Sequence, residues 1–153
     1  MTEQTTEKTE PKLMDINISV PITDKRVKDM LCTALEGGSN YWYRIVDHKF
    51  PEGVTHQDFK KGGKFTDPDD YYHSEQLIPL HPECSTFFVD KEEYHEDKNC
   101  KRHELNREAL IRGMNVMAEK YPHHFKDFIE ENDDADTADV YLQCCLFGEL
   151  VFG

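Results

Sequence analysis

Apolar residues recur at two different spacings along this chain of 153 residues, and that change of period restricts its fold more than any other feature. In residues 27–35 and 110–121 they return every three or four positions, as on the buried stripe of an amphipathic helix. Residues 16–20 alternate apolar and polar, and residues 85–90 form a short run typical of a strand. The pattern predicts an α+β fold, with a small antiparallel sheet packed against three or four helices.

End signals support four of these helices. Polar N-caps, a proline in a first turn and glycines after the last turn are the residues expected at such ends. In chain order they are Thr23 or Asp24, Gly37, Asn106, Pro122, Thr137 and Gly148.

The remaining segments are expected to be strands, loops or tail. Residues 41–46 predict a strand with Trp42 on one face and Tyr41 and Tyr43 on the other. Residues 85–90 and the return through 101–105 predict a hairpin, and the turn-rich residues 47–80 predict mainly loops. Residues 1–13 have the composition of a disordered acidic and polar tail, which leaves residues 14–153 as a single α+β domain.

The net charge of −13 narrows the partners that the surface can bind. Phosphates of nucleic acid need cationic contacts, and an anionic membrane surface needs them equally, so neither is expected as a direct partner. Acidic side chains complement a basic protein surface, although high charge also serves solubility alone. Two acidic groups are predicted to face such a partner, one at the hairpin tip and one near residue 132: Glu92, Glu93, Glu96 and Asp97, then Glu130, Glu131, Asp133 and Asp134.

Five cysteines, an odd number, argue against a disulfide framework. The polar N-terminal tail lacks the apolar region of a signal peptide, and no apolar run is long enough to span a membrane. A reduced, cytoplasmic protein with mostly buried thiols is therefore expected.

The segments HPEC and CKRH have the spacing of a zinc site. His81 and Cys84, then Cys100 and His103, form two pairs of N and S ligands that a hairpin could bring together. Against this, residues at i and i+3 of a plain strand point to opposite faces. The hairpin interpretation therefore favours packed or exposed thiols over a metal, and no cofactor is expected.

Catalytic motifs are absent from the sequence: it contains no G-x-S-x-G, no P-loop and no H-E-x-x-H. The expectation is a protein that is not an enzyme.

The segment GGSNYWY is the better binding candidate. Trp42 is expected in the core, which leaves the outer face to Tyr41 and Tyr43 beside the polar Ser39 and Asn40. Tyrosines dominate protein interfaces and also stack on planar ligands. These four residues could therefore contact a protein partner or hold a nucleotide-like small molecule.

Two segments also carry a family resemblance. Residues 27–43, with MLCTALEGGSNYWY, and residues 110–153, with DVYLQCCLFGELVFG, resemble a group of small proteins encoded by tailed bacteriophages and prophages. The resemblance implies a phage gene product in the bacterial cytoplasm, and it carries no catalytic residues with it. Together with the acidic charge it suggests a non-enzymatic protein that modulates or inhibits a host protein, in a defence or nucleic-acid-handling system.

Overall fold

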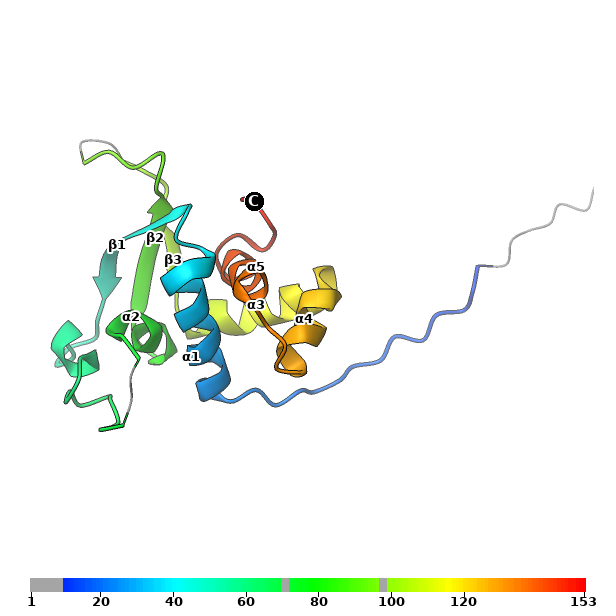
Figure 1. The fold of residues 1–153 in the computed structure, drawn as a ribbon, viewed down its shortest axis with the longest axis horizontal. Helices are drawn as coiled ribbons and strands as arrows, with labels where there is room; N and C mark the ends of the chain where they lie inside the picture. The colour runs from blue at the N-terminus through cyan, green and yellow to red at the C-terminus, as the bar shows by residue number, and fades with distance from the viewer. Residues whose placement is uncertain (1–9, 70–71, 97–98) are drawn as a thin grey trace, which may run out of the picture.

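The computed structural model describes residues 10–69, 72–96 and 99–153, and the fold class is the predicted α+β (Figure 1). The elements are, in chain order, α1 (Asp24–Thr33), the π-helical η1 (Ala34–Gly38), β1 (Tyr43–Lys49), the 3-10 helix η2 (His56–Phe59), α2 (Ser74–Leu77), the 3-10 helix η3 (Ile78–Leu80), β2 (Ser85–Asp90), β3 (His103–Leu105), α3 (Arg107–Lys120), α4 (Pro122–Ile129) and α5 (Ala135–Phe147). The four long helices are the predicted ones, and the short α2 lies in the turn-rich region where the sequence predicts mainly loops.

The three strands form one antiparallel sheet in the order β1-β2-β3. The register between β1 and β2 shifts between Ile45 and Asp47, so Val46 is an extra residue in β1. Such a bulge reverses which side chains face which side of the sheet beyond it. Ile45 lies opposite Phe88 before the bulge, and His48 lies opposite Thr86 after it. All four side chains therefore share the face that carries the core residue Phe88.

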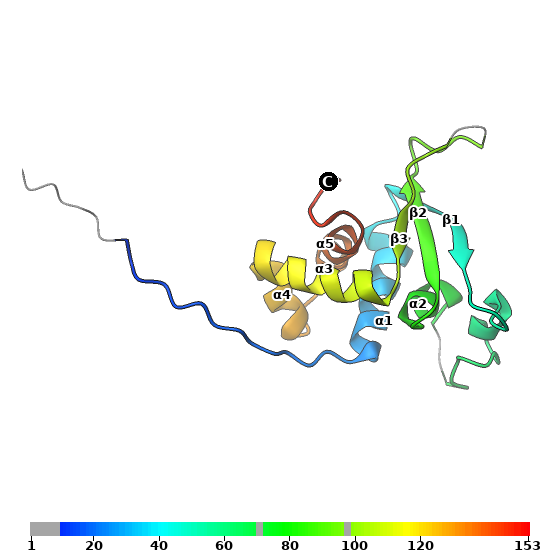
Figure 2. The same cartoon turned by 180° about the vertical axis from the view of Figure 1, so that it is seen from behind.

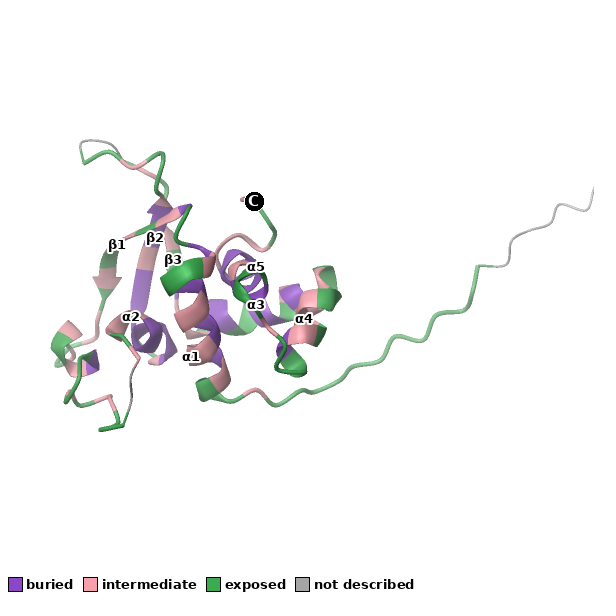
Figure 3. Cartoon of the chain, viewed as in Figure 1, coloured by how far each residue is buried: buried purple, intermediate pink, exposed green. Residues whose placement is uncertain are grey.

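Helices α1, α3, α4 and α5 gather on one side of the sheet, and both views show this arrangement (Figures 1 and 2). Buried residues concentrate where α5 meets the neighbouring helices and β3 (Figure 3). Eight of the thirteen residues of α5 are buried, which makes it the central element of the main core. Within the described residues, no helix combines the length and the apolar character needed to cross a membrane.

Four predicted helix ends are confirmed. Pro122 opens α4 in its first turn. The side chain of Thr23 accepts a hydrogen bond from the backbone of Arg26, and that of Asn106 accepts one from the backbone of Ala109. Gly148 ends α5 in the left-handed conformation, with φ 72°. These caps satisfy backbone groups that a helix end otherwise leaves unpaired.

Two expectations were wrong. Residues 16–20 form no strand: the segment is irregular and mostly exposed, because alternation alone supplies no neighbouring strand to pair with. Gly37 is not a left-handed helix stop. The helix continues as η1, and Gly38 is the glycine that the packing requires, because a Cβ there would lie 2.5 Å from the carbonyl oxygen of Ala135.

A second, smaller core lies beside β1 and β2. Phe59, Leu77, Ile78 and Cys84 are its buried members, and they come from the segment between β1 and β2. That segment lies at the end of the sheet opposite the hairpin tip (Figure 1). The segment therefore has apolar contacts of its own, and Leu80 near its end joins the main core.

The packing of α3 on α5 predicts the effect of Gly113→Ala. A Cβ at Gly113 would lie 2.3 Å from Cys145 Sγ and 2.7 Å from its Cα. We expect a loss of roughly 1–3 kcal/mol in the free energy of unfolding, because overpacking outweighs the gain in helix propensity. Urea denaturation measures it. Gly37→Ala is the control, since no atom lies within 4 Å of a Cβ there; equal stability of the two variants would contradict the packing argument.

Candidate metal centre

The predicted binding residues of GGSNYWY converge on one carboxylate. Asp139 of α5 accepts hydrogen bonds from Ser39 Oγ at 2.7 Å, Tyr41 OH at 2.7 Å and Trp42 Nε1 at 2.8 Å. Gln143 Nε2 donates a fourth at 3.1 Å. Burial and the bond to Asp139 raise the pKa of Tyr41 to about 12, so its hydroxyl stays protonated and donating. The cluster joins the turn before β1 to the central helix.

Only part of this segment faces solvent. Trp42 is buried, as predicted, and Ser39 is fully buried as well. The expectation that Tyr43 points outward with Tyr41 was wrong, because residues 39–42 form a turn and the strand begins at Tyr43. Tyr43 packs against the main core, and its hydroxyl donates to the carbonyl of Leu35 at 2.6 Å. Asn40 and the half-exposed ring of Tyr41 are what remains for a ligand.

The C-terminal segment is fastened to the same cluster. Gln143 Oε1 accepts hydrogen bonds from the backbone of Val151 and Phe152, each at 2.8 Å. The ring of Phe152 stacks on that of Trp42, with centroids 5.0 Å apart and planes 7° apart. Residues 39–42, the helix α5 and the C-terminal residues 151–152 thus meet in one hydrogen-bonded unit.

The two predicted acidic groups lie at different ends of the molecule. The described tip residues Glu92, Glu93 and Glu96 are exposed on the hairpin that projects beyond the sheet (Figure 1). Asp97 lies outside the described residues. The other group lies between α4 and α5, away from the hairpin in both views (Figures 1 and 2).

Acids of the second group contribute to the structure. Asp133 pairs with Arg26 at 2.9 Å, and Glu131 approaches the same guanidinium at 4.0 Å. Asp134 caps α5, and its carboxylate accepts a hydrogen bond from the backbone N–H of Thr137. That bond holds the pKa of Asp134 below the ordinary value. Glu130 is exposed at the end of α4. Two of the four carboxylates, those of Asp133 and Asp134, are therefore bound within the protein.

The four residues of the HPEC and CKRH pairs do not converge. Cys84 is buried just before β2, whereas His103 pairs with Phe88, four residues further along that strand. A strand advances ~3.3 Å per residue, which separates the two backbones by roughly 13 Å. His81 packs against Phe59 and Phe65, and the thiol of Cys100 donates to the carbonyl of Glu93 at 2.9 Å. Each residue has a local contact in place of a shared ion.

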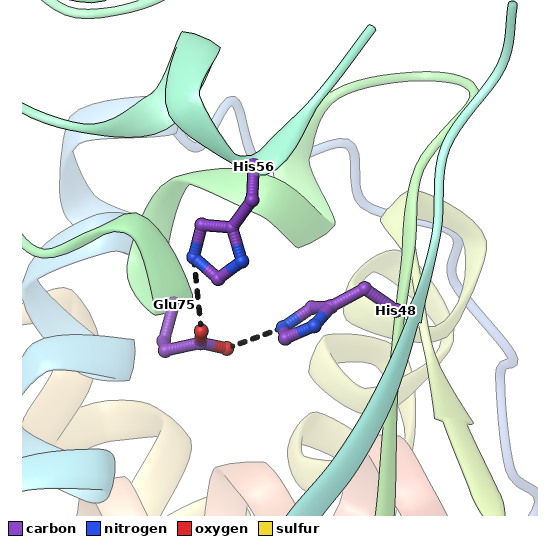
Figure 4. Close-up of side chains that lie close together, drawn as sticks. All are labelled: His48, His56 and Glu75. Carbon is purple, nitrogen blue, oxygen red and sulfur yellow. Dashed lines mark hydrogen bonds and ion pairs between the residues drawn. The ribbon is translucent and has the colours of Figure 1, made fainter.

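A different set of ligands does converge. The side chains of His48, His56 and Glu75 point toward one another (Figure 4). Among the described residues they are the one group of three or more His, Cys, Asp or Glu side chains whose ligand atoms all lie within 4.8 Å of one another. Glu75 Oε2 lies 2.9 Å from His48 Nε2, and Oε1 lies 3.6 Å from His56 Nε2. The side chains are 18%, 36% and 27% exposed for His48, His56 and Glu75, so an ion can reach them from solvent.

Three separate elements supply these ligands. His48 lies on β1, beyond the bulge at Val46, so its ring points to the helix-bearing face of the sheet. His56 opens η2, which is capped reciprocally by Thr55 and Asp58. Glu75 lies in α2, where Gln76 Oε1 accepts from the backbone N–H of His73 at 2.6 Å. Each ligand therefore sits at a point where the backbone is held by a bulge or a cap.

Aromatic packing orients the two imidazoles. Phe50 stacks on His48 with centroids 5.8 Å apart, and the rings of His48 and His56 meet edge to face at 4.9 Å. Burial lowers the pKa of His56, against the opposing effect of Glu75. The imidazole of His56 is therefore neutral at pH 7, which is the form that binds a metal.

The spacing suits a small transition-metal ion. Zinc bonds of about 2.1 Å in tetrahedral array place ligand atoms roughly 3.4 Å apart. One oxygen of Glu75 lies 2.9 Å from His48 Nε2, and the other lies 3.6 Å from His56 Nε2. Two histidines and one carboxylate leave a fourth position open, as in catalytic zinc sites. His56 Nε2 also lies 2.8 Å from Ser74 Oγ, a contact that metal binding would replace.

Sequence analysis missed this centre. The ligands lie far apart in the chain, in a pattern that belongs to no metal motif. All three also lie in residues 47–80, where the sequence predicts mainly loops. No local signal marks them, because the fold alone brings them together.

Comparisons with known proteins identify no relative: no family model, no curated protein sequence and no solved structure matches the chain.

The four hydrogen bonds to the carboxylate of Asp139 predict that Asp139→Asn loses much of its stability. The amide keeps the shape but has one acceptor oxygen where four donors converge, and hydrogen bonds to a charged group contribute ~1.5–3 kcal/mol each. We expect the free energy of unfolding to fall by roughly 2–4 kcal/mol, measured by urea denaturation. Asp136→Asn, at an exposed acid of the same helix, is the control and changes stability by less than about 1 kcal/mol. Equal effects would show that Asp139 is not the joint between α5 and the turn.

Proposed function

We propose that this protein binds a divalent transition-metal ion, zinc in the first place, through His48, His56 and Glu75. The single observation that carries the proposal is the convergence of two imidazole nitrogens and one carboxylate on a solvent-accessible point. Imidazole and carboxylate are ligands that zinc and its neighbours in the first transition row accept.

The surroundings of the three side chains favour an ion over a purely structural hydrogen-bond network. The carboxylate of Glu75 contacts both imidazoles, and the ligand atoms of all three side chains already lie close together. A bound ion would also link β1, η2 and α2 to one another. The ion is thus expected to stabilise the segment between β1 and β2.

Titration of the metal-free protein with Co²⁺ and Zn²⁺ tests the proposal. We expect one ion per chain, a visible Co²⁺ absorption band typical of low coordination number, and a thermal midpoint that rises with ion concentration. His56→Gln and Glu75→Gln each remove one ligand and are expected to weaken binding about a hundredfold or more, as measured by calorimetry.

His123→Gln is the matched control, because His123 is a largely exposed histidine on α4 far from the centre. It is expected to bind the ion as the unaltered protein does. Binding that survives both His56→Gln and Glu75→Gln, or that is lost equally with His123→Gln, would mean that the ion binds elsewhere.

A second candidate function is binding of a host protein with a basic surface, in keeping with the phage-family resemblance. The observation that favours it is the projecting β2–β3 hairpin with exposed Glu92, Glu93 and Glu96 (Figure 1). Its base is anchored, since Arg44 lies over the ring of Tyr94 at 4.0 Å and Arg102 pairs with Asp47 at 3.0 Å. An acidic tip on an anchored hairpin can attract a basic partner, and the hairpin does not have to become ordered when the partner binds.

Reversing the tip charge tests this second function. In a pull-down from bacterial lysate, a partner captured by the unaltered protein at low salt is expected to be lost with the double variant Glu92→Lys, Glu93→Lys, because each rim charge contributes attraction. Reversal at Glu130 and Glu131, between α4 and α5, is the control and should leave capture intact. Equal capture by all three proteins would exclude the hairpin as the docking site.

A further inference from the structure

One buried hydroxyl next to the candidate metal centre has no partner. Thr86 of β2 is fully buried, and its Oγ1 is the one buried side-chain N or O atom among the described residues that makes no hydrogen bond. An orphaned buried hydroxyl costs stability, so its presence needs an explanation.

The sheet register places this hydroxyl beside His48. Thr86 lies directly opposite His48 in β1 and opposite Leu105 in β3. Residues opposite one another in antiparallel strands share a face, with Cβ atoms about 4.5–5.5 Å apart. Of these two cross-strand neighbours only His48 has a side chain that can form a hydrogen bond.

Metal coordination through Nε2 would leave His48 with an Nδ1–H group that can donate a hydrogen bond. Its Nε2 faces Glu75 and is the atom available to the ion. When Nε2 binds a metal, the proton of the neutral ring must lie on Nδ1. A metal-binding histidine almost always donates that second N–H to an oxygen atom, which fixes the ring and its tautomer.

We propose that Thr86 Oγ1 accepts a hydrogen bond from His48 Nδ1–H when the metal is bound, and so acts as the positioning residue of this ligand. The inference rests on the proposed metal-binding function. It explains why a hydroxyl without a partner stands in the otherwise apolar row of Thr86, Phe88 and Leu105. The bulge at Val46 serves the same arrangement, because it brings His48 to the face of Thr86.

The test uses the full chain and Co²⁺ as the probe. Thr86→Val keeps the shape of the side chain and removes the hydroxyl. We expect its dissociation constant for Co²⁺ to rise about tenfold or more. The thermal midpoint of the metal-free variant should stay unchanged or rise, since the variant removes an unsatisfied polar group. Thr86→Ser, which restores the hydroxyl, is expected to recover most of the affinity.

Ser85→Ala is the matched control. Ser85 is the adjacent residue on the opposite face of β2, and its hydroxyl donates to Glu104, away from the centre. Its loss is expected to leave Co²⁺ affinity unchanged, whatever it does to stability.

A spectroscopic readout covers the case in which Thr86→Val fails to fold. In the zinc-loaded protein, ¹H–¹⁵N correlation spectra are expected to show His48 coordinated through Nε2, with an Nδ1 proton protected from exchange with solvent. Coordination through Nδ1, or an Nδ1 proton that exchanges freely, would overturn the inference.

The outcomes separate the two proposals. If Thr86→Val binds Co²⁺ as tightly as the unaltered chain while His56→Gln does not, the positioning role is wrong and the metal centre stands. If the unaltered chain binds neither Co²⁺ nor Zn²⁺, both proposals fall.

Discussion

Four hydrogen bonds to the carboxylate of Asp139 hold the sheet against the helices. Three come from the turn that leads into β1, and the fourth comes from Gln143, which also binds the backbone of the C-terminal segment. Asp139 stands on the central helix α5, so the start of β1 is placed relative to the core of the molecule. Pairing with β2 along the rest of the strand then places His48. The Asp139 cluster and the candidate metal centre thus lie at opposite ends of β1.

The helices could be predicted from the sequence because their signals are local. A cap such as Asn106 and a stop such as Gly148 act within one turn of the residue itself. The prediction of a strand at residues 16–20 was wrong for the opposite reason. A strand forms only with a neighbouring strand to pair with, and the sequence of the segment does not show whether one is present. The prediction for Tyr43 was wrong because the alternation of a strand does not extend through Trp42, which belongs to a turn. Buried residues could be predicted where one helical or strand periodicity runs through the whole element. They could not be predicted where the burial of a residue, such as Tyr43, depends on the position at which a turn ends.

The candidate metal centre shows the same limit more strongly. His48, His56 and Glu75 come from a strand, a 3-10 helix and a short α-helix, and each is separated from the next by a loop. The pairs at HPEC and CKRH have the better spacing in sequence, yet the hairpin register carries them apart. Spacing predicts a metal site only when one local motif holds all of its ligands. Here the loop-rich region and the second core decide which side chains meet.

The bulge in β1 has a consequence for how such a centre can arise or disappear. A strand has parity: a shift of one residue in its pairing exchanges the two faces for every position beyond the shift. With Val46 accommodated as a bulge, His48 faces Glu75; if Val46 paired as in a regular strand, the same histidine would face the other way. All three ligands could then be present while no site exists. The centre is therefore encoded in the register of a strand as much as in the identity of its side chains.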